Sequence, residues 1–535
     1  MTFLLKPTVQ ATLFAIWGVV LLNLLFLSAF TFFLFNLYLT TFMLWFIVTV
    51  LAWTIGLVPI IKYVFMPWHR KQCRLWTTTT RHSRLSVAFF HPYCNDGGGG
   101  ERVLWAAIES ILKKYKKDVQ IIIYTGDTNA TPDEILERVK QRFNMNMQVY
   151  KSSITFVYLR TRFMVEAKYY RVFTLLGQSI GSMVLGCEAL VRFVPDVYID
   201  SMGYAFTYPL FRYLASVPIL AYVHYPTIST DMLEQVRERR PTYNNRRLIA
   251  NNSNVSQIKL IYYRIFAYIY GWCGRCAQMA FCNSSWTKGH VERIWGLSPR
   301  SIHLVYPPCD VQEFLSMPLV NDDEQPLKTI VSVGQFRPEK DHTLQIRSFH
   351  ELLQRIPEHR DKLRLILIGS VRHDDDQQRV DELQTLVENL NLTQEVEFQL
   401  NINFAQLKGY LNKATIGLHT MWNEHFGIGS YRTKNKSAKF LNSNFSGIVE
   451  MMAAGAVVLA HKSGGPKMDI IDEGETGFLA SDIDSYATAM RQILEMKSTE
   501  RQQIREHARE SVDRFSAKKF EEQFMEPLEK VLKLQ

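Results

Sequence analysis

Two glutamates, Glu424 and Glu450, are separated by a stretch whose composition differs from the chain on either side. They lie 26 positions apart, and the 18 residues of 430–447 between them are polar and basic, with four lysines and arginines and no acidic residue. Without that stretch the carboxylates would be eight positions apart, in the rejoined sequence EHFGIGIVE followed by MMAAG. Gly427 and Gly429 follow the first glutamate, and glycines let backbone N–H groups approach phosphate oxygens closely. This combination predicts a site for a phosphate-bearing ligand.

A basic loop opens the second half of the chain, in the sequence SVGQFRPEKD of residues 332–341. It follows a predicted strand at 328–333, and α/β sheets bind their ligands at the carboxyl ends of strands. Lys340 is the first candidate to bind an anionic ligand and Arg337 is the second. A solvated surface loop is the alternative interpretation.

Two further glycine segments precede predicted helices, and helix N-termini attract anions. The first segment consists of Gly97, Gly98, Gly99 and Gly100. The second, with Gly464 and Gly465, opens a helix in the sequence SGGP. His224 ends a predicted strand at 219–223, where a lone histidine is more often structural than catalytic.

After residue 84, short apolar runs alternate with helical patterns, as expected for parallel α/β layers. Strands are predicted at 85–91, 119–124, 197–200, 219–223, 279–282 and 302–306, and in a second series at 328–333, 363–368, 396–400, 415–419 and 456–460. A short acidic linker, 321–326, separates the two series. We therefore expect two Rossmann-like domains facing a cleft, at 84–320 and 327–515, with a C-terminal helix at 516–535 that packs back on the first domain.

The first 66 residues predict a membrane anchor. No charged side chain occurs within residues 7–61, and a membrane span needs about 20 apolar residues, so one span or two are expected. A helical hairpin of about 11–34 and 41–62 fits by length, whereas the apolar core of a signal peptide has only about 7–15 residues. Six basic residues follow the stretch directly: Lys62, Arg70, Lys71, Arg74, Arg81 and Arg84. Because positive flanks stay in the cytosol, the body of the protein is expected on the cytosolic side.

The net charge of +10 suits phosphates or an acidic membrane surface, and no recognised nucleic-acid-binding motif occurs. Seven cysteines, an odd number, fit reducing surroundings. Cys273 and Cys276 form a lone C-x-x-C pair, expected to be buried thiols and not a zinc or redox site. Asp374–Asp376 could act as a metal clamp, but the triplet fits better as the start of a helix at 377–390, where carboxylates suit the dipole. No metal is expected.

Two aromatic and apolar segments with few acidic residues, 169–194 and 262–272, leave two interpretations open. They could lie at a bilayer interface, or they could be core helices of the first domain.

The rejoined glutamate sequence resembles the E-x7-E signature of retaining glycosyltransferases that use a nucleotide-activated sugar. Residues 332–341 resemble the V-G-R-x-x-x-E-K segment of that class, although Gln335 stands where arginine is usual. With GGGGERVLW, YVHYP and SGGPKMDII, these segments resemble the dolichol-pathway α-1,2-mannosyltransferases, which use GDP-mannose to extend trimannosyl-chitobiosyl-diphosphodolichol. The resemblance runs from about residue 84 to the C-terminus.

This resemblance implies a GT-B fold and addition of the fourth and fifth mannoses to a dolichyl-diphosphate oligosaccharide at the cytosolic face of the endoplasmic reticulum membrane. It implies that Glu424 and His224 contact the transferred sugar and that Glu450 holds the nucleoside ribose. Lys340 and Arg337 then serve the role of a divalent ion. Other mannosyltransferases of the pathway are candidate partners; nucleic acid is not.

Two alternatives remain open. One is a sibling transferase with another donor or linkage, such as the pathway's α-1,3/α-1,6 mannosyltransferase or an inositol-phospholipid transferase. The other is a membrane-bound protein whose site the stretch 430–447 has disabled. That stretch is interpreted as a retained short intron or an alternative transcript, because its length is a whole number of codons and its removal restores the motif. A functional insert is the other interpretation.

Overall fold

The protein's structure is a computed structural model that describes most of the chain. The described residues are 26–28, 30–31, 34, 36–46, 48–49, 56, 58–77, 84–170, 172–232, 253–309, 311–320, 325–371, 374–422, 424 and 447–533. They belong to two compact units, Met1–Trp68 and His69–Gln535. Gly427, Gly429 and nearly all of the predicted insert at 430–447 lie outside the described residues.

The described part of the first unit is helical, and most of its large apolar side chains are exposed. Residues 36–46 are helical without a break, and a π-helix, η1 (Ile61–Phe65), leads into α2 (Met66–Thr77). A hairpin with spans at 11–34 and 41–62 would need a turn near 35–40. That form of the predicted anchor is therefore wrong over residues 36–40, where the backbone keeps helical hydrogen bonding.

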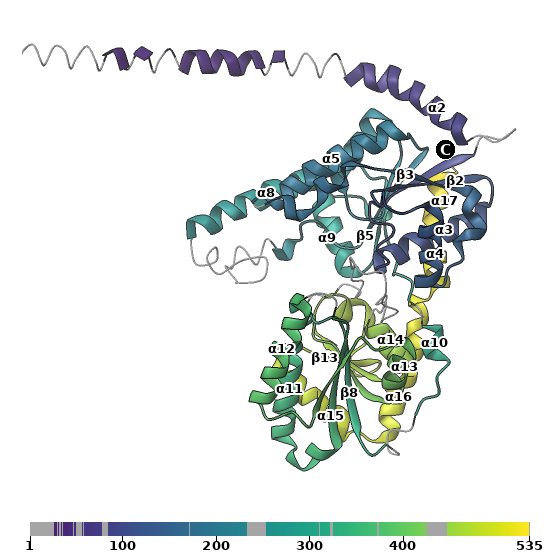
Figure 1. Cartoon of the computed structure of the whole chain (residues 1–535), viewed down its shortest axis with the longest axis vertical. Helices are drawn as coiled ribbons and strands as arrows, with labels where there is room; N and C mark the ends of the chain where they lie inside the picture. The colour runs from purple at the N-terminus through teal and green to yellow at the C-terminus, as the bar shows by residue number, and fades with distance from the viewer. Residues whose placement is uncertain are drawn as a thin grey trace, which may run out of the picture. The chain divides into compact units, whose positions relative to one another are not determined.

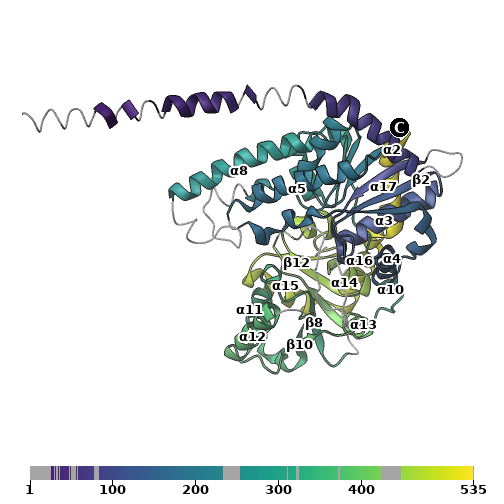
Figure 2. The same ribbon diagram turned by 45° about the horizontal axis from the view of Figure 1, so that its top comes forward.

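The second unit contains two parallel sheets (Figures 1 and 2). The first sheet has the order β3-β2-β1-β4-β5-β6-β7, with all neighbours parallel. Its strands are β1 (Leu85–Phe90), β2 (Val119–Thr125), β3 (Ile154–Tyr158), β4 (Val197–Asp200), β5 (Ile219–Val223), β6 (Met279–Cys282) and β7 (Ile302–Leu304). Because helices cover both faces, the inner strands are nearly continuous buried runs of apolar residues.

The second sheet is also parallel, in the order β10-β9-β8-β11-β12-β13. Its strands are β8 (Lys328–Val333), β9 (Leu363–Gly369), β10 (Val396–Leu400), β11 (Ala414–Leu418), β12 (Val457–His461) and β13 (Gly477–Ala480). In each sheet the strand order reverses once, between β1 and β4 in the first and between β8 and β11 in the second. The prediction of two parallel α/β domains is confirmed.

Helices surround both sheets. In the first domain they are α3 (Gly99–Tyr115), α4 (Pro132–Phe143), α5 (Thr174–Arg192), α8 (Ser253–Gly274) and α9 (Ser285–Trp295). In the second they are α10 (Gln312–Leu315), α11 (His342–Arg355), α12 (Asp374–Asn389), α13 (Phe404–Asn412), α14 (Ile448–Ala454), α15 (Ile483–Glu495) and α16 (Ser498–Ser511). The Asp374–Asp376 carboxylates lie in the first turn of α12, as predicted.

The C-terminal helix α17 (Ala517–Leu532) packs into the core of the first domain. Phe520 and Phe524 stack at 5.6 Å, and Phe524 also lies 5.0 Å from the ring of Phe281 on β6. Phe515, just before the helix, is buried in the core of the second domain. The C-terminal segment therefore packs against the cores of both domains.

Eleven strands were predicted and all eleven are present, with ends that differ by at most two residues. The sequence analysis missed β3 and β13, the outermost strand of one edge in each sheet. Three of the five residues of β3 are only half-buried, so β3 lacks the continuous burial of an inner strand. Strand β13 is fully buried, but it is only four residues long and begins with a glycine, a residue that weakens a strand signal. All seven cysteines are free, as predicted, and six of them, including Cys273 and Cys276, are buried.

Candidate active site

Lys340 and Glu424 form an ion pair at the carboxyl edge of the second sheet. The Lys340 Nζ lies 2.7 Å from Glu424 Oε2, and the two side chains are 17% and 7% exposed. Lys340 follows β8 and Glu424 follows β11, the neighbouring strands between which the sheet order reverses. Ligands of open α/β sheets bind at such a reversal. Two residues predicted from separate motifs are thus brought into direct contact at the expected place.

His419 adds a third polar group to this pair. Its Nε2 lies 3.5 Å from Glu424 Oε2. Burial alone would raise the pKa of Glu424, but the Lys340 ammonium and His419 outweigh that effect and hold the pKa well below its usual range. Burial lowers the pKa of His419, which leaves its imidazole neutral at pH 7. Glu424 is therefore ionised.

The backbone that carries Lys340 is held in place by residues that sequence reasoning missed. Thr420, directly after His419, donates its hydroxyl to the carbonyl of Lys340 at 2.8 Å. The Gln345 amide donates to the same hydroxyl oxygen at 2.8 Å. Asp341 has φ of 46° and accepts from the Leu344 N–H at the start of α11. The loop that carries Lys340 is thus held by residues that follow β8 and by residues that follow β11, the two strands between which the sheet order reverses.

The second glycine turn contacts Glu424 directly. The N–H of Gly465 donates to the carbonyl of Glu424 at 2.7 Å, and Gly464 has φ of +55°, a conformation that favours glycine. Glu450 lies in the first turn of α14 and is 2% exposed. Since α14 packs against β11 and β12, its N-terminal turn lies at the carboxyl edge of this sheet.

Two side chains of the basic loop, those of Arg337 and Gln335, differ in their burial. The Arg337 side chain is 35% exposed and lies 4.0 Å from Glu339. Gln335, which stands where the resemblance expects arginine, is 4% exposed. Within the part of the chain that the structure describes, neither its amide nitrogen nor its amide oxygen has a hydrogen-bond partner. A buried amide without partners is costly, so Gln335 joins the candidate ligand contacts.

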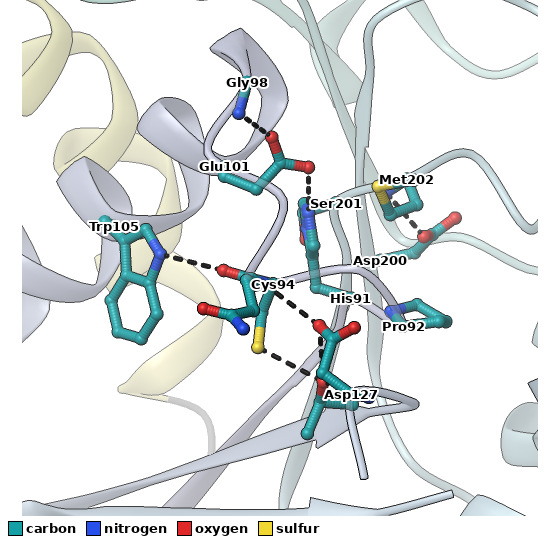
Figure 3. Close-up of polar contacts among 12 residues, drawn as sticks. His91, Pro92, Cys94, Gly98, Glu101, Trp105, Asp127, Asp200, Ser201 and Met202 are labelled. Carbon is teal, nitrogen blue, oxygen red and sulfur yellow. Dashed lines mark hydrogen bonds and ion pairs between the residues drawn. The ribbon is translucent and has the colours of Figure 1, made fainter. Parts of the chain in front are cut away.

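In the first domain, Gly98 of the glycine segment contacts a buried carboxylate, that of Glu101 (Figure 3). Gly97, with φ of +77°, and Gly98 form the turn, whereas Gly99 and Gly100 already belong to α3. Glu101 accepts the N–H of Gly98 and pairs with His91, whose Nε2 lies 3.2 Å from Glu101 Oε1. One N–H group predicted to bind an anion is therefore already occupied by a side chain.

His224 lies beside this segment. A Cβ placed on Gly100 would lie 3.7 Å from His224 Nε2, so only a small residue keeps this space open. Burial, followed by the nearby His91, lowers the pKa of His224 to about 4. At pH 7 its imidazole is neutral.

The sequence analysis also missed His91, Glu101 and Ser201. His91 Nδ1 lies 2.8 Å from the Ser201 hydroxyl. His91 directly follows β1 and Ser201 directly follows β4, the two strands between which the first sheet reverses. Both strands were predicted, so the polar residue at each strand end was the signal that could have identified His91 and Ser201. Glu101 lies in the first turn of α3 and had no such signal.

The carboxyl edges of the two sheets are joined by Asp469, a buried residue of the π-helix η11 (Pro466–Ile470) after β12. Its carboxylate accepts the N–H of Ser285 at 2.9 Å and the hydroxyl of Tyr306 at 2.9 Å. Ser285 begins α9, directly after β6. The predicted sites of the two domains thus lie on the two edges that this carboxylate connects.

Acid should lower the free energy of unfolding of the second domain, because His342 is buried in its neutral form. This residue follows the basic loop, is 2% exposed and stacks on Phe336 at 4.9 Å. Burial lowers the pKa of His342 to about 3, whereas an unfolded histidine titrates near 6.5. Between these values the unfolded state binds more protons, so the free energy of unfolding falls as the pH decreases. His342 should account for about 2 kcal/mol of that loss between pH 7 and pH 5.

Urea unfolding at pH 7 and pH 5 measures this contribution. His342→Gln should lose about 2 kcal/mol less than the unchanged protein over that interval, while His359→Gln, at a half-exposed surface histidine, should lose as much as the unchanged protein. An equal loss in all three proteins would contradict the assignment.

Comparisons with known proteins agree with this geometry. Residues 84–295 match the family described as ALG11 mannosyltransferase N-terminus, and residues 320–430 match glycosyl transferases group 1. The second match ends at the first residue of the predicted insert.

The structure resembles that of Anabaena Alr3699/HepE in complex with UDP and glucose, with a TM-score of 0.52 and 14% identity, covering 84% of this chain and all of the other. Sucrose-phosphate synthase from Thermosynechococcus elongatus gives a TM-score of 0.53 at 16% identity, with the same coverage. These likenesses show the two-domain fold of this glycosyltransferase class.

Sequence relatives extend along most of the chain. A protein from Mus musculus named GDP-Man:Man(3)GlcNAc(2)-PP-Dol alpha-1,2-mannosyltransferase is 49% identical, over 87% of this chain and 91% of its own length. Relatives of the same name from Xenopus laevis and Dictyostelium discoideum are 48% and 42% identical, over 91% and 83% of this chain and 96% and 84% of their own lengths. On this similarity, the protein belongs to the family of GDP-Man:Man(3)GlcNAc(2)-PP-Dol alpha-1,2-mannosyltransferases.

Proposed function

We propose that the protein transfers mannose from GDP-mannose, in α-1,2 linkage, to a dolichyl-diphosphate-linked oligosaccharide, adding its fourth and fifth mannoses. The observation that carries this proposal is the contact between Lys340 and Glu424, in a chain that is 49% identical to a relative of that name. Because the ammonium and the ionised carboxylate are in contact, they can act on adjacent groups of one donor. The ammonium can bind the negative diphosphate, and the carboxylate can stabilise the positive charge that develops on the sugar.

The residues divide this chemistry between them. Lys340, Arg337 and the backbone N–H groups near Gly427, Gly429 and Gly464 bind the diphosphate, and Glu450 binds the ribose hydroxyls. Gly465, whose own N–H donates to the Glu424 carbonyl, shapes the turn beside them. Glu424 stabilises the oxocarbenium-like sugar as the bond to the leaving phosphate breaks. Fixed charges contribute strongly to catalysis because they need no reorganisation when charge develops. His224, neutral at pH 7, contacts the transferred sugar through hydrogen bonds, and the segment at 97–100 holds the acceptor.

The reaction proceeds with retention and without a metal cofactor in this proposal. Lys340 and Arg337 supply the positive charge that would otherwise come from a divalent ion. The Asp374–Asp376 triplet, the motif that most suggested a metal clamp, lies in the first turn of α12, where carboxylates suit the helix dipole.

The enzyme acts at the endoplasmic reticulum membrane with both α/β domains in the cytosol. The relatives' names give a dolichol-linked acceptor, which is a membrane lipid. The basic residues after the apolar stretch, four of them between Lys62 and Arg74, favour the cytosolic orientation. Other mannosyltransferases of the pathway are proposed partners.

The identity of 42–49% to relatives from three organisms favours this activity over both alternatives, a sibling transferase and an impaired protein. The effect of the insert at 430–447 on turnover is a separate prediction.

Transfer of labelled mannose tests the proposed function. The purified full-length chain should move mannose from GDP-mannose, and not N-acetylglucosamine from its UDP form, to the trimannosyl acceptor, and linkage analysis should find α-1,2 bonds. Activity should persist in excess EDTA. Activity that disappears in EDTA and returns with manganese would contradict the metal-independent mechanism, and transfer from UDP-N-acetylglucosamine alone would contradict the donor.

Substitutions in the ion pair should separate the two roles. Glu424→Gln should lower kcat by a factor of roughly 30–1,000, equivalent to about 2–4 kcal/mol, with little change in GDP affinity. Lys340→Ala should reduce GDP affinity as well as kcat, because its partner is the diphosphate. Lys408→Ala, which removes a surface ion pair with Glu313, serves as control and should change either value little. Near-normal kinetics of both site variants would refute the assignment.

Removal of residues 430–447 should raise kcat. The insert separates Glu424 from the helix that carries Glu450, while an extra loop costs only about 0.6 kcal/mol per doubling of its length. The two forms should therefore melt at similar temperatures but differ in turnover. Equal turnover would show that the insert is neutral.

A further inference from the structure

A tyrosine at the carboxyl end of β5 exposes an aromatic ring beside a candidate sugar contact of the first domain. Tyr225 directly follows His224 and is 41% exposed. Its ring stacks on that of Trp286, in the first turn of α9, with the ring centroids 5.5 Å apart and an angle of 17° between the planes. Trp286 is 8% exposed. The buried ring therefore supports the exposed ring from one side.

The exposed part of the Tyr225 ring adds little to folding, because only apolar surface that leaves water stabilises the fold. The stack on Trp286 nevertheless holds the ring in one orientation. A flat apolar surface that is fixed in advance lowers the cost of ordering a ligand on it. The Tyr225 ring thus has the geometry of a binding platform.

A carboxylate lies at the edge of this platform. Trp286 donates its indole N–H to Asp231 Oδ2 at 3.2 Å. The His290 ring lies edge-on to Trp286, with the centroids 3.9 Å apart, and His290 Nε2 is 3.6 Å from Asp231 Oδ1. The Asp231 side chain is still 33% exposed, and each carboxylate oxygen accepts more than one hydrogen bond. Oxygen acceptors are therefore fixed close to the aromatic stack.

The orientation of His290 is fixed in turn. The backbone N–H of Thr230 donates to His290 Nδ1 at 3.4 Å, and the Thr230 hydroxyl lies 2.8 Å from the same nitrogen. Because Nδ1 accepts, the ring hydrogen is on Nε2, the nitrogen that faces Asp231. His290 is 1% exposed. The carboxylate is thus positioned by two buried aromatic side chains before a ligand binds.

The platform lies where the first domain meets the second. Ser285, the residue before Trp286, donates its N–H to Asp469 of the second domain at 2.9 Å, and α9 packs against η11. The donor contacts of the proposed function, Lys340 and Glu424, are on the second domain. A ligand held by first-domain residues at this boundary is therefore the acceptor.

A pyranose sugar suits both parts of this surface. The C–H groups on one face of the sugar ring can pack on an aromatic ring, while its hydroxyls can donate to a carboxylate. Sites for small ligands combine apolar and aromatic side chains with a few placed polar groups in the same way.

We propose that Tyr225, supported by Trp286, forms with Asp231 a subsite for the terminal mannose of the acceptor, the sugar that receives the transferred residue. His224, which contacts the transferred sugar in the proposed function, is the preceding residue, so the two sugars lie side by side as the reaction requires. The inference rests on the proposed function for the identity of the acceptor. Binding of the acceptor sugar does not depend on transfer, so the two can fail separately.

Substitution of the ring tests the subsite. Tyr225→Leu keeps an apolar side chain but removes the flat ring, and it should raise the KM for the trimannosyl lipid acceptor roughly tenfold, with the KM for GDP-mannose unchanged. Tyr225→Phe keeps the ring and should stay within about twofold of the unchanged protein. Asp231→Asn, which keeps an oxygen that accepts from Trp286, should raise the acceptor KM by a factor of roughly 3–10.

Tyr213→Leu is the matched control. Tyr213 is also an exposed tyrosine of the first domain whose ring stacks on a tryptophan, Trp272, at 6.1 Å. Its substitution should change neither KM. All assays use the full-length chain and acceptor dispersed in detergent, and melting temperatures verify that each variant folds.

A binding measurement separates the subsite from catalysis. The full-length protein is mixed with GDP and the trimannosyl-chitobiose glycan without its lipid, and saturation-transfer NMR is recorded with irradiation of the aromatic protons. Saturation should reach the protons of a mannose ring. The affinity for the glycan should fall roughly tenfold in Tyr225→Leu and persist in Tyr225→Phe and Tyr213→Leu.

An unchanged acceptor KM and glycan affinity in Tyr225→Leu, or an unchanged acceptor KM in Asp231→Asn, would overturn the subsite even if mannosyl transfer is normal. A rise in the KM for GDP-mannose alone would place the ring in the donor site and equally overturn it. An equal loss in Tyr225→Phe would do the same, because the contact would then depend on the hydroxyl and not on the ring face. Ring-dependent glycan binding without any mannosyl transfer would uphold the subsite and reject the proposed function.

Discussion

All strands of a parallel sheet end at the same edge, and the reversal of strand order leaves space above two neighbouring strand ends. In this protein both sheets follow that rule. His91 and Ser201 follow the reversal strands of the first sheet, while Lys340 and Glu424 follow those of the second. The position of the site is thus a consequence of the topology, and its chemistry depends on which polar residue follows each strand.

Within the second domain, one ion pair determines the electrostatics of the site. Lys340 and Glu424 are largely removed from water, and such pairs are costly unless geometry and hydrogen bonds are good. Here His419, the Gly465 N–H and the hydroxyl of Thr420 support the pair or its backbone. The charges are consequently in place before a ligand arrives, which is the condition for electrostatic stabilisation of a developing charge.

The first domain differs from the second in the charge of its candidate site and in the polarity of its outer helices. Its site contains a neutral histidine beside a capped glycine turn, and its outward helices are apolar on the side away from the sheet. Small residues on the inner face of α5 allow close packing on the domain, so the larger apolar residues remain outside. A domain built this way suits an acceptor of which one part is a sugar and the other a lipid.

The sequence by itself determined the fold class and eleven of the strands, and it identified Lys340 and Glu424 as candidate site residues. Inner strands of parallel sheets are recognisable because they must be apolar on both faces, and Lys340 and Glu424 are recognisable because their motifs are local. Two edge strands were missed: β3 lacks that continuous burial, and β13 is a buried run of only four residues that begins with a glycine. Only the tertiary structure decided that Lys340 contacts Glu424, 84 positions away, and that Glu101 occupies an N–H of the glycine turn. It also decided that one side of α5 and α8 stays exposed. These features depend on which surfaces meet in the folded chain, and local composition and spacing carry no information about such distant contacts.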